Sequence, residues 1–299
     1  MKIQLLVIAL LGIVDCSGLN AGELYQAKVL TKSGEFTSGI EGPAADNHGN
    51  VYAVNFGAQG TIGLVDGKGR GKLVHRLPEG SIGNGIRFDK QGNMFIADYP
   101  KHNVLRVDVK TGKLTVFAHE SKMNQPNDLA IDSQGNLYAS DPNWAASSGQ
   151  LWRISNKGVV TQLASNMGTT NGIEVSPDGK KLYVNESVQK NVWQFDLSKD
   201  GKISNKQLLR KFEGFGFDGM RCDVKGNIYI TRHGKGTVVI LSPKGEILQE
   251  IDVLGKHPTN LAFGGTDGKT VFVTEAEKTR IVTFRVEYSG ATWSDNYAK

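Results

Sequence analysis

The sequence is poor in the residues that define several classes of protein. It contains only two cysteines among 299 residues, which excludes a fold stapled by many disulfides. Proline is also scarce, with 8 residues, and the aromatic content is ordinary, so the composition does not indicate a disordered chain. No apolar run approaches the roughly 20 residues that a transmembrane helix needs. The length therefore predicts one large β domain or two ordinary domains.

Concentrated basic charge is absent as well, although the formal net charge is +5. Lysines such as Lys68, Lys157 and Lys244 stand singly at expected turns, and no basic stripe or basic helix is visible. The sequence therefore predicts no nucleic-acid partner. No obligate protein partner is inferred either.

The N-terminal segment has the pattern of a secretory signal peptide at residues 1–21. A basic start is followed by the short apolar run Ile3–Val14, which is too short to span a membrane. We expect residues 22–299 to form the mature, secreted or periplasmic protein. Lipid attachment at Cys16 is the less favoured alternative, because an aspartate directly precedes this cysteine.

Glycine is abundant, with 37 residues, and its distribution reveals an internal repeat. A turn glycine that follows an acidic or polar residue recurs at intervals of 42 to 47 residues. The text around it repeats too, as in Asp89-Lys90-Gln91-Gly92-Asn93 and Asp132-Ser133-Gln134-Gly135-Asn136. The six equivalent glycines are Gly49, Gly92, Gly135, Gly179, Gly226 and Gly268.

Each repeat has the pattern of four short strands joined by turns. In the fourth repeat we expect strands at Gly172–Ser176, Lys181–Asn185, Asn191–Leu197 and Gln207–Phe212. Six repeats of this kind predict an all-β fold, a six-bladed β-propeller with four strands per blade. The sixth repeat lacks a fourth strand, and Tyr25–Thr31 resembles the missing one, so we expect the N-terminal strand to close the last blade. No helix of useful length is predicted.

Oxygen-bearing side chains recur where each first strand begins. In a propeller the first strands line the channel, so these side chains would form a ring at one mouth. Carboxylate and amide oxygens are the ligands of a hard cation such as Ca²⁺. The alternative is turn chemistry repeated with the fold, which the pattern favours for two of the asparagines. The ring is Glu41, Asn84, Asn127, Asn171, Asp218 and Asn260, and the turn interpretation is favoured for Asn84 and Asn260.

Several motifs together resemble the gluconolactonase, senescence-marker-protein (regucalcin) and luciferin-regenerating-enzyme family of six-bladed propellers. Their order and spacing carry the resemblance more than any single fragment. One position departs from many members, because Ala44 stands where an aromatic residue often follows the first motif. The motifs are Glu41-Gly42-Pro43, Pro126-Asn127-Asp128, Asn171-Gly172-Ile173, Phe217-Asp218-Gly219-Met220 and Pro258-Thr259-Asn260-Leu261-Ala262.

This resemblance implies a metal-dependent hydrolase, most often of lactones, with small-molecule substrates. The family's metal ligands map onto Glu41, Asn171 and Asp218, and Asn127 maps onto a further residue that binds the metal or its water. Asp218 and Asn127 are the expected catalytic residues, with Asp218 as base or nucleophile. Ca²⁺ is the expected cofactor, and Mg²⁺, Mn²⁺ and Zn²⁺ remain open.

Side chains at the ends of the second strands would lie at the same mouth and are candidate substrate contacts. They are Asp98, Asp141, Asn185 and His233, for which turn chemistry or a solvated loop is the alternative. Trp144, in a long loop of the third repeat, is a candidate lid or wall. A non-catalytic binding propeller is the main alternative function. A strictosidine-synthase-like propeller is a third, but its catalytic pattern is not visible.

Overall fold

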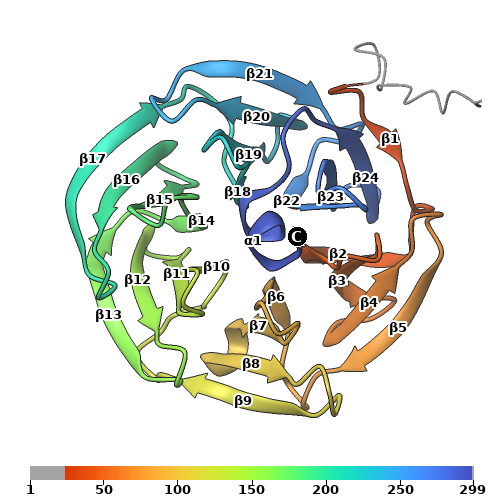
Figure 1. The fold of residues 1–299 in the computed structure, drawn as a ribbon, viewed down its shortest axis with the longest axis horizontal. Helices are drawn as coiled ribbons and strands as arrows, with labels where there is room; N and C mark the ends of the chain where they lie inside the picture. Colours follow the sequence, from red (N-terminus) through yellow and green to blue (C-terminus); the bar gives the residue numbers. More distant parts are fainter. Residues whose placement is uncertain (1–23, 298–299) are drawn as a thin grey trace, which may run out of the picture.

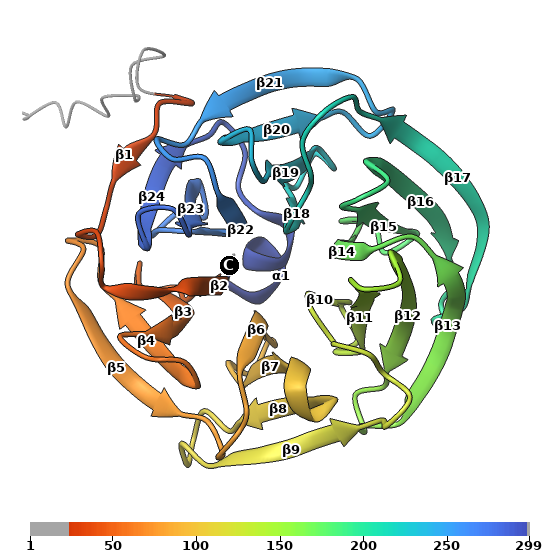
Figure 2. The same cartoon turned by 180° about the vertical axis from the view of Figure 1, so that it is seen from behind.

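The computed structural model describes residues 24–297, which form six four-stranded antiparallel sheets arranged around a central channel (Figure 1). The same ring is seen from the opposite side in Figure 2. This arrangement confirms the predicted all-β, six-bladed propeller. The expected signal peptide at residues 1–21, and Cys16 within it, lie outside the described residues.

The elements follow one another blade by blade along the chain. They are β1 (Lys28–Val29); β2 (Phe36–Ala45), β3 (Val51–Phe56), β4 (Thr61–Val65) and β5 (Gly71–Arg76); β6 (Gly83–Phe88), β7 (Met94–Asp98), the 3₁₀ turn η2 (Tyr99–Lys101), β8 (Asn103–Val107) and β9 (Leu114–His119); β10 (Leu129–Ile131), β11 (Leu137–Asn143), β12 (Ser148–Ile154) and β13 (Val160–Met167); β14 (Thr170–Val175), β15 (Lys181–Glu186), β16 (Asn191–Leu197) and β17 (Ile203–Lys211); β18 (Met220–Cys222), β19 (Ile228–Arg232), β20 (Thr237–Leu241) and β21 (Ile247–Asp252); β22 (Pro258–Gly264), β23 (Thr270–Glu275), β24 (Arg280–Arg285); and α1 (Ala291–Tyr297).

The N-terminal strand closes the ring, as the sequence predicted. β1 pairs antiparallel with β24, and Lys28 lies opposite Thr283 in this register. The backbone N–H of Ile281 also donates to Thr31 Oγ1 at 2.9 Å. The two ends of the propeller are therefore joined in one sheet, and β24 has no free edge.

The repeated Asp-x-x-Gly-Asn text forms the turn between the first and second strands. In the third blade, Asp132 Oδ1 accepts the backbone N–H groups of Gln134 and Asn136, and Asn136 Nδ2 donates to Asp132 Oδ2 at 2.8 Å. Gly135 has a φ of 81°, which glycine adopts without a Cβ clash. The same aspartate-centred turn recurs at Asp46, Asp89 and Asp223.

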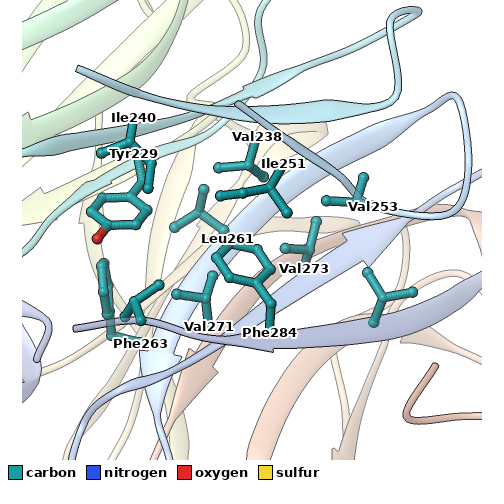
Figure 3. Close-up of a cluster of buried hydrophobic side chains, with 12 residues drawn as sticks. Tyr229, Val238, Ile240, Ile251, Val253, Leu261, Phe263, Val271, Val273 and Phe284 are labelled. Atoms are coloured by element: carbon teal, nitrogen blue, oxygen red, sulfur yellow. The ribbon is translucent and has the colours of Figure 1, made fainter. Parts of the chain in front are cut away.

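Apolar side chains fill the wedges between neighbouring blades. Figure 3 shows the cluster between the fifth and sixth blades, where Leu261 and Val273 pack among side chains of both sheets. The rings of Tyr229 and Phe263 meet edge to face there, with their centroids 4.9 Å apart. Cys222 is buried in another such cluster, and burial raises the pKa of its thiol.

The short helix α1 lies over the centre of the ring and was not predicted (Figure 1). Asn296 Nδ2 donates to Phe88 O at the far end of β6, opposite the predicted mouth. Ala44 lines a small cavity of about 50 Å³ beneath α1, so the space left by this small residue lies under the helix. Among residues 24–297 no helix combines the length and apolar character needed to cross a bilayer.

Candidate functional site

The four residues predicted to hold a metal lie at one mouth of the channel, three of them at or just before the start of a first strand and Glu41 within the longer strand β2. Glu41 is in β2 and Asn171 is in β14, whereas Asn127 and Asp218 precede β10 and β18. We call these four residues the mouth cluster. Their assigned roles remain predictions.

Glycines directly after the mouth residues allow the blades to approach one another. A Cβ added at Gly42 would lie 1.8 Å from Asn84 O of the next blade, and one at Gly219 would lie 1.8 Å from Asn260 Oδ1. Gly219 also donates its N–H to Thr259 O at 2.8 Å. The repeated acidic-or-amide residue followed by glycine is therefore a packing device as well as a turn signal.

Hydrogen bonds fix the orientation of the mouth cluster. Glu41 Oε2 accepts the N–H of Gly42 at 2.6 Å and Asn260 Nδ2 at 3.1 Å. Asn171 Nδ2 donates to Ser187 Oγ at 3.1 Å, and Ser187 in turn donates to Phe217 O. Since the amide nitrogen of Asn171 is engaged, its Oδ1 is left as a buried acceptor without a hydrogen-bond partner.

The electrostatics of the mouth cluster favour a cation. Burial, with the charge of Asp128, raises the pKa of Glu41, and burial together with Glu41 raises the pKa of Asp218. Two carboxyl groups held close together and partly withdrawn from water resist double ionisation unless a positive charge joins them. The Oδ1 atoms of Asn84 and Asn171 are buried acceptors without a hydrogen-bond partner. This donor set fits a hard divalent cation.

The side-chain ligand atoms that the mouth cluster offers belong to carboxyl and amide groups. Within residues 24–297 there is no group of three or more His, Cys, Asp and Glu side chains placed to hold a metal. The candidate site combines two carboxylates with amides, which is an oxygen-only set. Such a set matches calcium or magnesium better than a structural zinc centre.

A second charged cluster lies deeper in the channel and was missed from the sequence. Arg221 Nη1 is 2.9 Å from Asp128 Oδ2, and Arg87 Nη1 is 3.4 Å from Asp128 Oδ1. Arg87 Nη2 is 3.7 Å from Glu174 Oε2. All four side chains are buried. We call them the channel network. Single charged residues inside apolar first strands, as in Ile86-Arg87-Phe88, were the available signal.

Two cavities open beside the mouth cluster. The amide lobe, of about 350 Å³, is lined by Glu41, Asn84, Asn127 and other polar side chains. The apolar lobe, of about 420 Å³, is lined by Trp144, Val188, Phe215 and Phe217, with Asp218, Lys190 and His233. Trp144 lines both lobes, so it forms a wall between them, and the sequence had not identified Val188 or Phe215.

Three of the four expected substrate contacts are buried inside the protein. Asp98 accepts Ser81 Oγ at 2.8 Å, and Asp141 accepts Trp152 Nε1 at 2.8 Å. Asn185 Nδ2 donates to Asp218 O at 2.7 Å. None of the three side chains is exposed. In this structure their polar atoms bond to neighbouring loops, and their role as substrate contacts remains a prediction.

His233, the fourth expected contact, lines the apolar lobe. Its ring stacks on that of His257, with the centroids 4.7 Å apart. Burial and the neighbouring His257 lower the pKa of His233, which favours the neutral imidazole. Its position agrees with a substrate contact, and the role itself remains a prediction.

The mouth cluster and the channel network lie within the region that matches a known family model. Residues 40–277 match the family model described as the SMP-30/gluconolactonase/LRE-like region. The match covers most of the chain. The chain belongs to this family.

The relatives and structural neighbours of this chain have names that refer to different activities or ligands. The chain is 28% identical to a gluconolactonase of Zymomonas mobilis over 64% of this chain and 60% of that protein. It is 28% identical to a diisopropyl-fluorophosphatase of Loligo vulgaris over 88% of this chain and 93% of that protein. A calcium-binding regucalcin of Agrobacterium tumefaciens shares the fold, with a TM-score of 0.77, 23% identity and coverage of 89% and 95%.

Proposed function

We propose that this protein is a divalent-cation-dependent hydrolase of lactones. The observation that carries the proposal is the pair of carboxyl groups, Glu41 and Asp218, held beside unpartnered amide oxygens at an accessible mouth. A gluconolactonase among the relatives supports lactones as the substrate class. Glu41, Asn171 and Asp218 would hold the cation, with Asn127 beside it.

The proposed reaction adds water to the ester. The acyl carbon–oxygen bond of the ring breaks, and the products are a hydroxy acid and, at neutral pH, one released proton. When bound, a divalent cation would polarise the ester carbonyl and lower the pKa of a bound water. Asp218 would accept the proton of the attacking water or attack the carbonyl itself. Asn127 would orient the ester by its amide group, and Asn171, whose Nδ2 donates to Ser187, would hold the cation through Oδ1.

The fixed geometry of the mouth supports this assignment. Asn171 Nδ2 and the backbone around Asp218 are already bound within the protein, through Ser187 and Asn185. These contacts hold the ligand oxygens before substrate arrives, so little reorganisation is needed during the reaction.

The decisive experiment is a chelation and reloading series on the purified protein. Metal content is measured first. The protein is then stripped with a chelator and reloaded with Ca²⁺, Mg²⁺, Mn²⁺ or Zn²⁺, and proton release from D-glucono-δ-lactone and δ-valerolactone is followed. We expect hydrolysis to disappear on stripping and to return with one of these cations. Absence of binding by all four would instead support a non-catalytic binding propeller.

Phosphotriester hydrolysis is a second candidate activity. The relative named diisopropyl-fluorophosphatase matches nearly the whole length of both chains, which the gluconolactonase does not. The same oxygen-ligated cation would polarise a P=O group in the way it polarises a carbonyl. Fluoride release from a fluorophosphate in the same reloading series tests this candidate.

A further inference from the structure

The apolar lobe exposes large hydrophobic side chains that the proposed chemistry does not use. Trp144, Val188 and Phe215 are 45%, 49% and 52% exposed. They come from the loops that follow β11, β15 and β17 in neighbouring blades, and they line one cavity with Asp218. Exposed apolar side chains gathered in a concave site are a usual feature of small-molecule binding pockets.

The backbone at Phe215 is held in a conformation that disfavours an aromatic residue. Phe215 has a φ of 55°, in the left-handed region that bulky side chains rarely adopt. Gly214 before it, with a φ of 65°, is the residue that tolerates this region. A left-handed aromatic residue that is also half exposed gains little from burial. Such strain at a cavity points to a role in binding.

Hydrogen bonds hold the backbone of the loop that carries Phe215. Arg232 Nη2 donates to Gly214 O at 2.9 Å, and the guanidinium carbon lies 4.4 Å from the centre of the Phe212 ring. Gly216 N–H donates to His233 O at 3.2 Å. The backbone on both sides of Phe215 is therefore fixed, and its side chain is presented to the cavity rather than left to a free loop.

The loop of Trp144 is tied to the neighbouring blade beside Val188. Gln189 Nε2 donates to Ser147 O at 2.9 Å, and Gln189 Oε1 accepts the N–H of Thr169 at 2.8 Å. This amide therefore bridges the third and fourth blades directly next to Val188. The apolar side chains are positioned by polar contacts beneath them, which is the arrangement of a preformed site.

We propose that the apolar lobe binds an alkyl or acyl substituent of the substrate, so that the preferred substrates are lactones carrying an apolar chain. This inference rests on the proposed function. The apolar lobe adjoins Asp218, and the amide lobe adjoins Glu41 and Asn127, so an ester at the mouth cluster would direct one part of the substrate into each lobe. A polyhydroxylated sugar lactone would leave Trp144, Val188 and Phe215 without apolar contact.

A series of δ-lactones with the same six-membered ring tests the proposal. The cation-loaded protein is assayed with D-glucono-δ-lactone, δ-valerolactone, δ-octalactone, δ-decalactone and δ-dodecalactone, and each kcat/KM is divided by the uncatalysed hydrolysis rate. We expect this ratio to rise by about fourfold for each buried methylene until the lobe is filled. We also expect the alkylated members to exceed the sugar lactone.

Variants locate the effect. Phe215→Ala and Trp144→Ala should flatten the dependence of kcat/KM on chain length. Val116→Ala is the matched control, because Val116 is 56% exposed on the outer strand β9 and should leave the dependence unchanged. Circular dichroism and thermal melting confirm that each variant is folded.

The possible outcomes distinguish failure of this inference from failure of the proposed function. A flat dependence on chain length, or a preference for the sugar lactone, would overturn the inference and leave the proposed function standing. A steep dependence that persists in both Phe215→Ala and Trp144→Ala would also overturn it, because the chain would then bind elsewhere. Failure to hydrolyse any lactone in any metal-loaded form would remove the proposed function itself.

Discussion

The central channel holds two charged clusters built from the first strands of the blades, and they differ in how their charges are balanced. The channel network pairs two guanidinium groups with the carboxylates of Asp128 and Glu174. The mouth cluster sets Glu41 and Asp218 together with amides and has no cationic side chain of its own. The deeper cluster is neutral by itself, whereas the outer one needs a proton or a cation.

This difference assigns the two clusters to different tasks. Removal of one partner from a balanced buried network leaves an uncompensated charge, so the channel network should matter for folding. The two carboxyl groups of the mouth cluster repel each other when both are ionised. An added cation relieves this repulsion, so the mouth cluster should matter for cation binding. Asp128 connects the two, because it pairs with both arginines and its charge contributes to the raised pKa values of Glu41 and Asp218.

The largest expected effect is on catalysis at the mouth. Asp218→Asn keeps the shape of the side chain and removes its negative charge, so we expect the kcat/KM for the best lactone to fall about 10⁴-fold. Steady-state kinetics with the cation-loaded variant measure the loss, and circular dichroism checks the fold. A variant that binds the cation and still turns over at the normal rate would contradict the assignment of Asp218.

Much of the fold could be predicted because each repeat contains a recognisable turn motif. The aspartate and glycine of each turn stand at fixed spacing, and the predicted strand Asn191–Leu197 appears unchanged as β16. Helix α1 escaped prediction since it has only two turns, and its position depends on contacts such as that of Asn296 with Phe88, 208 residues away in sequence.

In the candidate site, only the residues at equivalent positions of the repeat could be predicted. Equivalent positions in the repeat placed Glu41 and Asp218 at one mouth, because first strands begin there. Whether a side chain at a strand end faces the cavity or the protein depends on neighbouring loops, so the inward burial of Asp141 could not be foreseen. The charged residue in Met220-Arg221-Cys222 was a local signal, but its partner Asp128 lies 93 residues away, so the pairing itself could not be predicted.

The next largest expected effect is a loss of stability when the channel network is broken. Arg221→Met removes a guanidinium that lies 2.9 Å from Asp128 and leaves that buried carboxylate undercompensated. We expect the free energy of unfolding to fall by about 3–5 kcal/mol, measured by urea denaturation of the metal-free protein. The double variant Arg221→Met/Asp128→Asn should regain much of the loss. Equal stability of the single variant and the unchanged protein would remove the structural role of this network.

The mouth cluster should respond with the opposite sign. Glu41→Gln removes one of two neighbouring like charges and keeps an acceptor oxygen for the N–H of Gly42 and for Asn260. We expect the metal-free variant to gain about 1–2 kcal/mol of stability at pH 8. The rise in melting temperature on adding the preferred cation should disappear. A destabilised metal-free variant would place Glu41 among the structural residues and would blur the contrast between the two clusters.

The smallest expected effect concerns Asn84, for which the sequence favoured a turn role. Its Oδ1 is buried without a hydrogen-bond partner and its side chain lines the amide lobe beside Glu41. We expect Asn84→Ala to weaken cation affinity about tenfold by calorimetric titration, because one oxygen near the site is lost. Asn84→Asp, which adds a third carboxylate at the same position, should instead tighten binding. Identical affinities in all three proteins would return Asn84 to a turn role and confine the cation site to the four residues of the mouth cluster.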